Sequence, residues 1–198
     1  MPTPDSPPPD AARDHAIRET YDKLPYPAEP ERYSHPGRLA AVALLRGLDA
    51  PEPRTARILE LGCADGGNIL PMAETLPDAS FYGIDISPRQ IELGREMIKA
   101  AGLHNVSLDA MNLRDFPDDL PPFDFIIVHG VFSWVPHDVQ DRILQICREN
   151  LAANGIAYVS YNTYPGWSGL EMARNWMLFR TRGIEDPTER VGAAIDAA

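Results

Sequence analysis

The 198-residue sequence is poor in cysteine: it holds only Cys63 and Cys147, with no Cys-x-x-Cys pair and no Cys/His cluster. Zinc sites and disulfide frameworks need several such residues at short, regular spacings. We therefore expect neither a metal site nor a structural disulfide. Cys63 lies in a glycine-rich segment, where we interpret it as a small packing residue rather than as a redox group.

A long apolar segment is also missing. No run of 18 apolar residues occurs, and residues Met1 to Asp5 lack the basic and apolar pattern of a signal peptide. We expect no membrane partner and a cytoplasmic location.

Basic clusters are absent as well. The chain has 18 lysine and arginine residues against 29 aspartate and glutamate residues, which gives a net charge of −11. A protein that binds nucleic acid needs a locally basic patch to meet the phosphate backbone. We therefore expect no nucleic-acid partner. The acidic surface could attract a lysine-bearing substrate, but acidic surfaces also serve solubility alone, and we prefer that interpretation.

Hydrophobic residues make up 44% of the chain, which is enough for one domain with a good core. Residues 1–9 are rich in proline and have no periodicity, which predicts a disordered tail. Helical patterns over residues 10–23 and 39–48 are separated by a proline-rich stretch. We group residues 10–50 as an N-terminal helical cap.

From residue 56 onward, strand-like apolar runs alternate with helical patterns. Strands are predicted at 56–61, 80–85, 106–109, 124–129 and 155–161, and helices at 67–76, 88–101, 137–152 and 168–181. The run Phe125-Ile-Ile-Val128 is apolar on both faces, as in a parallel strand buried on both sides. Ser87, Pro88 and Gln90 form a helix start signal with a capping box. This order predicts a doubly wound α/β fold with a mostly parallel, Rossmann-like sheet in residues 51–182.

The first predicted strand runs into a glycine-rich turn between Arg57 and Asn68. Gly62, Ala64 and Gly66 match the glycine spacing of methyltransferases. A second template also fits, because Gly67 in place of Gly66 gives the spacing of dinucleotide-binding proteins. The glycine pattern alone therefore leaves both ligands open, together with a tight turn that binds nothing.

Two acidic residues favour one of these ligands. Glu60 precedes the first glycine by two residues, where its charge would repel a pyrophosphate but not a cationic sulfonium amino acid. Asp85 ends the next predicted strand, and its carboxylate can accept hydrogen bonds from both ribose hydroxyls. Its alternative role as a helix N-cap is already filled by Ser87. We therefore predict an S-adenosylmethionine site that includes Asp85 and the adjacent Ile86.

The loop after the third predicted strand contains Asn112 and Leu113. The Asn112 side chain could meet the adenine amino group, with the Leu113 N–H on a ring nitrogen. An ordinary loop asparagine is an equally good interpretation, and the residues alone leave the two open.

The fourth predicted strand ends in His129-Gly-Val-Phe-Ser-Trp134, at the edge that lines the ligand crevice in this architecture. His129 is the residue best placed to reach the methyl group, either as a general base or through a backbone carbonyl that orients the donor. A structural histidine is the alternative. Trp134 could stack over the cofactor or shape the substrate channel, and a core or lid aromatic is the competing interpretation.

The fifth predicted strand ends in a group of aromatic residues, Tyr161, Tyr164 and Trp167. Such rings can surround an amine or a sulfonium through cation–π contacts. They could equally form a hydrophobic plug beneath a partner domain. We include the three among the substrate-lining residues, with Tyr161 also a candidate catalytic residue beside His129.

Five segments resemble a known family. They are Tyr21-Asp-Lys-Leu-Pro-Tyr-Pro27, Leu59-Glu-Leu-Gly-Cys-Ala-Asp-Gly-Gly-Asn68, Gly83-Ile-Asp-Ile-Ser-Pro-Arg-Gln-Ile91, His129-Gly-Val-Phe-Ser-Trp-Val-Pro136 and Tyr158-Val-Ser-Tyr-Asn-Thr-Tyr-Pro-Gly-Trp167. They look like the bacterial class I methyltransferases that carry a methyltransferase regulatory domain, a group that includes rickettsial protein-lysine methyltransferases acting on outer-membrane proteins. The resemblance covers about residues 15–182.

The resemblance implies transfer of a methyl group from S-adenosylmethionine to a protein lysine. A small-molecule acceptor, or a module that binds the cofactor without turnover, is the alternative. The implied cofactor positions are Glu60, Gly62, Gly66, Asn68, Asp85 and Asn112, and Tyr21 and Tyr26 join the substrate-lining residues. Asn112 departs from the family pattern, which more often has aspartate there.

Members of the resembled family continue further, with a regulatory region that would be a partner within the same chain. Full methyltransferase sheets close with an antiparallel hairpin after the fifth strand, whereas only helix-like sequence follows Asn162 here. We expect a sheet without that hairpin, and we interpret residues 183–198 as the start of a truncated downstream region.

Overall fold

The computed structural model describes residues 18–19, 22–23 and 28–196. The predicted disordered tail and most of the predicted helix over residues 10–23 lie outside these residues. These residues form two compact units, one spanning residues 28–161 and the other holding residues 162–196 together with 18–19 and 22–23. The predicted division at residue 182 stays a prediction.

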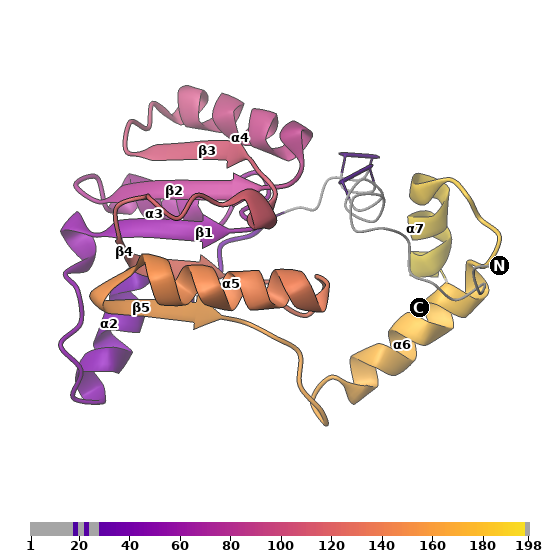
Figure 1. The fold of residues 1–198 in the computed structure, drawn as a ribbon. Helices are drawn as coiled ribbons and strands as arrows, with labels where there is room; N and C mark the ends of the chain where they lie inside the picture. Colours follow the sequence, from indigo (N-terminus) through magenta and orange to yellow (C-terminus); the bar gives the residue numbers. More distant parts are fainter. Residues whose placement is uncertain (1–17, 20–21, 24–27, 197–198) are drawn as a thin grey trace, which may run out of the picture. The chain divides into compact units, whose positions relative to one another are not determined.

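The larger unit is built on one parallel sheet of five strands in the order β3-β2-β1-β4-β5 (Figure 1). The strands are β1 Arg57–Leu61, β2 Ser80–Asp85, β3 Val106–Ala110, β4 Phe123–Val128 and β5 Leu151–Val159. All five predicted strands are confirmed, although β5 begins before the predicted residue 155. No antiparallel strand joins the sheet within the described residues, as predicted.

The strand order reverses between β1 and β4, which pair with each other at the centre of the sheet. In such doubly wound sheets, ligands bind outside the carboxyl ends of the strands at this reversal. The ends of β1, β2 and β4 therefore define where a site is expected.

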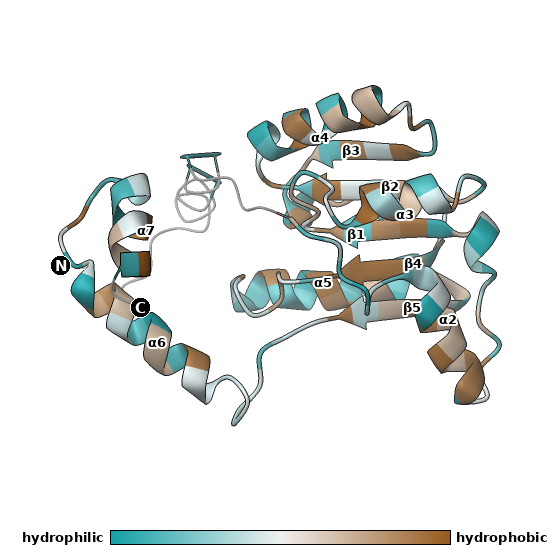
Figure 2. Ribbon diagram, turned by 180° about the vertical axis from the view of Figure 1, so that it is seen from behind, coloured by the Kyte–Doolittle hydropathy of each residue, from teal (hydrophilic) through white to brown (hydrophobic). Residues whose placement is uncertain are grey.

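Four α-helices flank the sheet within the same unit. They are α2 Pro36–Leu45, α3 Ile69–Thr75, α4 Pro88–Ala101 and α5 His137–Asn150, with short 3₁₀ turns η1 at Pro53–Thr55 and η2 at Leu113–Asp115. Figures 1 and 2 show α5 on one face of the sheet and α2 and α3 on the other. The alternation of strands and helices thus produces the predicted doubly wound α/β fold.

Each face of the sheet has its own apolar core, because successive strand residues point to opposite sides. Ile58, Phe125 and Ile127 pack on the face that α3 covers. Leu59 and Ile126 pack on the α5 face. The central strands are mostly apolar (Figure 2). Burying each such side chain contributes about 1.5–3 kcal/mol, which makes this sheet a firm support for the loops at its carboxyl edge.

Helix α4 begins with the predicted cap, in which Ser87 Oγ accepts a hydrogen bond of 3.2 Å from the Gln90 N–H. The second half of the predicted capping box is wrong. The Ser87 N–H donates to Asp85 Oδ1 at 2.9 Å instead, and Gln90 Oε1 is buried without a hydrogen-bond partner in the described chain. Asp85, at the end of β2, thus accepts from the Ser87 N–H, the donor that a capping box assigns to the Gln90 side chain.

The second unit contains α6 Ser168–Arg180 and α7 Pro187–Asp196. Helix α6 agrees with the predicted helix over residues 168–181. Its apolar side chains Leu170, Met172, Trp176 and Phe179 are exposed. None of the helices in the described residues is long and apolar enough to cross a membrane.

Candidate cofactor and acceptor site

The glycine-rich turn after β1 is tied to β2 by its own backbone. The N–H groups of Gly62 and Cys63 both donate to the Ile84 carbonyl, at 2.8 and 3.0 Å. Gly62 has a φ of +77° and Gly66 one of +83°, a region that residues with a Cβ rarely adopt. A Cβ on Gly62 would also lie 2.4 Å from Cγ2 of Val131. The turn therefore needs glycine at its first position for both conformation and space.

Asp85, at the end of β2, holds this turn in place. Its Oδ2 accepts a hydrogen bond of 3.0 Å from the Ala64 N–H, and its Oδ1 accepts from the Ser87 N–H. Ala64 is the only described non-glycine residue with a positive φ, +50°, so this bond supports a strained backbone. A carboxylate has about four acceptor positions. Asp85 can therefore brace the turn and still accept from a ligand.

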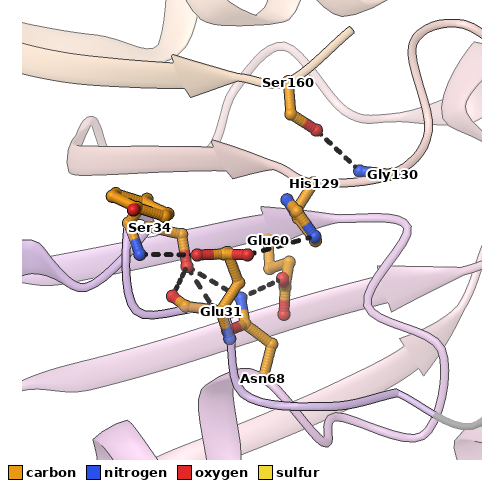
Figure 3. Close-up of polar contacts among 8 residues, drawn as sticks. Glu31, Ser34, Glu60, Asn68, His129, Gly130 and Ser160 are labelled. Atoms are coloured by element: carbon orange, nitrogen blue, oxygen red, sulfur yellow. Dashed lines mark hydrogen bonds and ion pairs between the residues drawn. The ribbon is translucent and has the colours of Figure 1, made fainter. Parts of the chain in front are cut away.

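Glu60 lies under the same turn and is only 2% exposed. Its Oε1 accepts a hydrogen bond of 2.6 Å from Asn68 Nδ2 (Figure 3). Its Oε2 is buried and has no hydrogen-bond partner among the described residues. Burial raises the pKa of Glu60 to about 7; the hydrogen bond from Asn68 opposes this rise, and the negative charge of Asp85 adds to it.

The unpartnered oxygen of Glu60 indicates which kind of ligand the glycine-rich turn can bind. A phosphate would place a second negative charge beside a buried carboxyl group, which is unfavourable. A cationic ammonium group would provide both the missing donor and the opposite charge. The residues present therefore fit the amino acid end of S-adenosylmethionine better than a pyrophosphate.

Asn68, just before α3, connects Glu60 to the segment that precedes α2. Its Oδ1 accepts a hydrogen bond of 2.8 Å from the Glu31 N–H, and its Nδ2 lies 3.1 Å from Ser34 Oγ. Gly67 permits this approach, because a Cβ there would lie 2.1 Å from the carbonyl oxygen of Ala28. Residues 28–34 are thus fastened against the start of α3.

His129 follows β4 directly and lies between Tyr158 of β5 and Glu31 of the segment before α2. Its ring stacks on the Tyr158 ring of β5, with centroids 6.1 Å apart and an angle of 27°. Its Nε2 lies 3.9 Å from Glu31 Oε2 (Figure 3), and its Nδ1 is buried without a hydrogen-bond partner in the residues described. Burial, followed by the charge of Glu31, raises the pKa of Tyr158.

Asn112 plays a structural part at the end of β3. Its Oδ1 accepts a hydrogen bond of 3.1 Å from the Arg114 N–H and caps η2, which begins at Leu113. This is the loop interpretation of Asn112. The adenine contacts of Asn112 and Leu113 stay a prediction, as does the place of Ile86 in the site.

The predicted aromatic residues do not all belong to one unit. Tyr161 contacts Phe132 within the sheet unit, with ring centroids 6.2 Å apart. In the other unit, Tyr164 donates a hydrogen bond of 2.7 Å to Glu171, and Trp167 is the N-cap residue of α6. Their shared role around a substrate stays a prediction.

Of the three remaining candidates, only Trp134 lies within the described residues. Trp134 is half exposed in the turn after β4. Tyr21 and Tyr26 lie outside the described residues. No group of three or more histidine, cysteine or acidic side chains in the described part of the chain is arranged to hold a metal ion.

A protein-family model described as a methyltransferase domain matches residues 59–157, which is half of the chain. The match runs from β1 to β5 and includes Glu60, the glycine-rich turn, Asp85 and His129. This chain belongs to the class I methyltransferase family.

Matches to individual proteins cover more of this methyltransferase chain than the family model does. RP789 of Rickettsia prowazekii is 42% identical over 176 residues, which are 89% of this chain and 32% of RP789. RP028 of the same organism is 39% identical over 172 residues, 87% of this chain and 69% of RP028. The structure of PKMT2 from Rickettsia typhi in complex with AdoHcy is 43% identical, with a TM-score of 0.74, and the match covers 79% of this chain and 31% of that one. The methyltransferase chain thus spans about a third of RP789 and of PKMT2.

Sequence reasoning missed Glu31 and Ser34. They lie in a segment whose prolines argue against regular structure, so no periodicity places them in space. Asn68 was predicted as a cofactor residue only from the family resemblance. Its hydrogen bond with the Glu31 N–H joins residues that are 37 positions apart in the sequence. The only local signal for Asn68 in the sequence was its position as a polar residue at the start of a predicted helix.

Proposed function

We propose that this methyltransferase domain binds S-adenosylmethionine and transfers its methyl group to the side-chain amine of a protein lysine. The observation that carries the cofactor assignment is the buried carboxyl group of Glu60. It lies beside the glycine-rich turn with one oxygen unpartnered in the described chain, while Asp85 stands at the neighbouring strand end. This pair suits a ligand with a cationic amino acid at one end and a ribose at the other.

The residues that would hold the cofactor lie along the carboxyl edge of the sheet. They are Glu60, Gly62, Ala64, Gly66, Asn68, Asp85, Ile86, Asn112, Leu113 and the backbone of His129. When bound, S-adenosylmethionine supplies a methyl group on a positively charged sulfur. The protein's task is then to hold the acceptor nitrogen in line with that methyl group and to exclude water.

The lysine acceptor is what the sequence resemblance to rickettsial protein-lysine methyltransferases implies, and the 43% identity to PKMT2 from Rickettsia typhi supports that resemblance. A lysine amine has an ordinary pKa of about 10.4 and must lose a proton before it can act as a nucleophile. A group at the acceptor site would have to take up that proton, and His129, which directly follows β4, is the candidate base.

A small-molecule acceptor is the second candidate. A probable fatty acid methyltransferase of Pseudomonas putida is 38% identical, but over only 81 residues, 40% of this chain. The shorter match is consistent with a shared cofactor site and carries little about the acceptor. The third candidate is a module that binds S-adenosylmethionine without turnover.

The test combines binding with turnover on the purified chain. Calorimetry should show S-adenosylmethionine binding much more tightly than NAD. Release of S-adenosylhomocysteine should then follow addition of poly-L-lysine but not addition of a fatty acid or a small carboxylic acid. Tighter binding of NAD would overturn the cofactor assignment. Turnover with the small molecules alone would replace the lysine acceptor, and binding without any turnover would favour the non-catalytic module.

A further inference from the structure

The Glu31 carboxylate is held in a defined position although its segment has no regular structure. Its backbone N–H donates to Asn68 Oδ1 at 2.8 Å, and its carbonyl accepts from Ser34 Oγ at 2.8 Å. One carboxylate oxygen, Oε1, accepts a hydrogen bond of 2.8 Å from the Tyr33 N–H. The other, Oε2, faces His129 (Figure 3). The side chain is 25% exposed, so it is partly sheltered but can be reached from solvent.

The distance between Glu31 Oε2 and His129 Nε2 has a specific chemical meaning. At 3.9 Å it is too long for a direct hydrogen bond. A nitrogen atom about 2 Å to the side of the midpoint between them can lie about 2.9 Å from both. A primary ammonium group has three N–H donors and no acceptor. It therefore matches this pair, with the stacked ring of Tyr158 forming the wall behind His129.

We propose that Glu31 and His129 together form the binding site for the ammonium group of the methyl acceptor, with Glu31 as the residue that selects a cationic amine. This proposal rests on the proposed function and specifies its acceptor site. His129 Nε2 takes one proton from the ammonium group, which frees the lone pair of the nitrogen. That pair forms the bond to the methyl carbon as the carbon–sulfur bond breaks and leaves its electrons on sulfur. The Glu31 carboxylate stabilises the resulting imidazolium.

The hydrogen bonds of Asn68 also fix the position of the proposed acceptor site relative to the proposed cofactor residues. Asn68 holds the Glu31 backbone through Oδ1 and the Glu60 carboxyl group through Nδ2. One side-chain amide therefore fixes the separation between the carboxyl group assigned to the cofactor and the carboxylate assigned to the acceptor. A methyl transfer needs such a fixed separation, because its rate depends on alignment.

The decisive measurement is binding rather than turnover. Nα-acetyl-L-lysine methylamide would be titrated by calorimetry into the protein saturated with S-adenosylhomocysteine. Glu31→Gln keeps the shape of the side chain and removes its charge. We expect the variant to bind this amine at least about 10-fold more weakly than the natural chain, since hydrogen bonds to charged groups contribute on that scale.

Glu29→Gln is the matched control, because Glu29 is an exposed acid on the same segment. It should bind the amine within about twofold of the natural chain, as expected for an exposed and screened charge. Both variants should keep the affinity for S-adenosylhomocysteine. The uncharged probe Nα-acetyl-L-norleucine methylamide should not distinguish Glu31→Gln from the natural chain.

The outcomes separate this proposal from the lysine assignment. Equal amine affinity in Glu31→Gln and the natural chain, or no measurable amine binding to either, would overturn the Glu31 site even if poly-L-lysine is methylated. Amine binding that depends on Glu31, together with turnover only on an uncharged acceptor, would support the site and reject the lysine reaction. With poly-L-lysine as the acceptor, Glu31→Gln should raise KM more than it lowers kcat, and Glu31→Asp should recover part of the loss.

Discussion

The side-chain amide of Asn68 donates to the buried carboxyl group of Glu60 across 2.6 Å. Both side chains are almost fully buried, at 4% and 2% exposure. The hydrogen bond stabilises the charged form of Glu60, while burial and the charge of Asp85 destabilise it. Burial prevails, so Glu60 changes its protonation state near neutral pH.

The first prediction is that Glu60 makes the ligand-free protein less stable as pH rises. Its pKa is about 7 in the folded chain and 4.5 as its ordinary value. Between these values the folded state holds a proton that the unfolded state has released, so stability falls with increasing pH and levels off above pH 7. The effect is at most about 3 kcal/mol, at about 1.4 kcal/mol for each pH unit. Urea unfolding from pH 4.5 to 8 measures it.

Glu60→Gln isolates this contribution from the other carboxyl groups. The variant keeps an oxygen that can accept from Asn68 but cannot ionise. The difference in unfolding free energy between the natural chain and the variant should shift in favour of the variant as pH rises from about 4.5 to 7. A difference that is constant across this range would show that Glu60 titrates normally.

The second prediction concerns Asp85. Asp85→Ala removes the acceptor for the Ala64 N–H and the proposed ribose contacts. Affinity for S-adenosylhomocysteine should fall about 10- to 150-fold, which corresponds to losing hydrogen bonds to a charged acceptor. Asp78→Ala, an exposed acid before β2, is the control and should change the affinity less than twofold. A comparably small change in Asp85→Ala would remove this residue from the site.

The framework of this fold was open to prediction because its signals are local. The run from Phe125 to Val128 is apolar at every position, and all four side chains are fully buried in β4. Ser87 caps α4 because its hydroxyl can accept from a first-turn N–H, and Pro88 suits the first helical position. The glycine-rich turn was recognisable because Gly62 and Gly66 need a positive φ that few residues adopt.

The contacts of residues 28–34 could not be predicted in this way. Glu31 meets Asn68 and His129 only after the chain has passed through β1 and β4, and no periodicity marks that segment. Gly67 illustrates the same limit. It matched only the spacing of the dinucleotide alternative, whereas the structure shows that its missing side chain leaves room for the Ala28 carbonyl. Local patterns specify elements, and such contacts depend on which elements the fold brings together.

The third prediction tests that contact. Gly67→Ala would place a Cβ 2.1 Å from the Ala28 carbonyl oxygen, so the backbone of the segment must move. Stability should fall by about 1–3 kcal/mol, as in other overpacked sites, and binding of Nα-acetyl-L-lysine methylamide should weaken as Glu31 moves. Gly169→Ala is the control, since nothing lies within 4 Å of its added Cβ. It lies in α6 and should be neutral or stabilising by up to about 1 kcal/mol. Equal unfolding curves for both variants would contradict a close contact at Gly67.

The last prediction is that a second carboxyl group beside Glu60, at the position of Asn68, destabilises the fold in a pH-dependent way. Asn68→Asp changes the shape of the side chain little and keeps an acceptor for the Glu31 N–H. It also removes the donor to Glu60 and sets two carboxyl groups side by side in a buried site, where they cannot both be charged without a large cost. Stability at pH 8 should fall by about 3 kcal/mol. At pH 5 Glu60 is protonated and can donate a hydrogen bond to the new carboxylate, so at least half of the loss should be recovered.

The control for this variant is Asn154→Asp, which also places a carboxylate beside an existing one. Asn154 Nδ2 lies 3.4 Å from Asp49 Oδ2, but the pair is exposed to solvent. Water and salt screen such a pair, so its effect should stay within about 0.5 kcal/mol at both pH values. Urea unfolding of both variants at pH 5 and pH 8 makes the comparison. A loss in Asn68→Asp that is the same at the two pH values would mean that the Asn68 amide acts only as a packing group, and that the charge of Glu60 has no part in holding residues 28–34 against the start of α3.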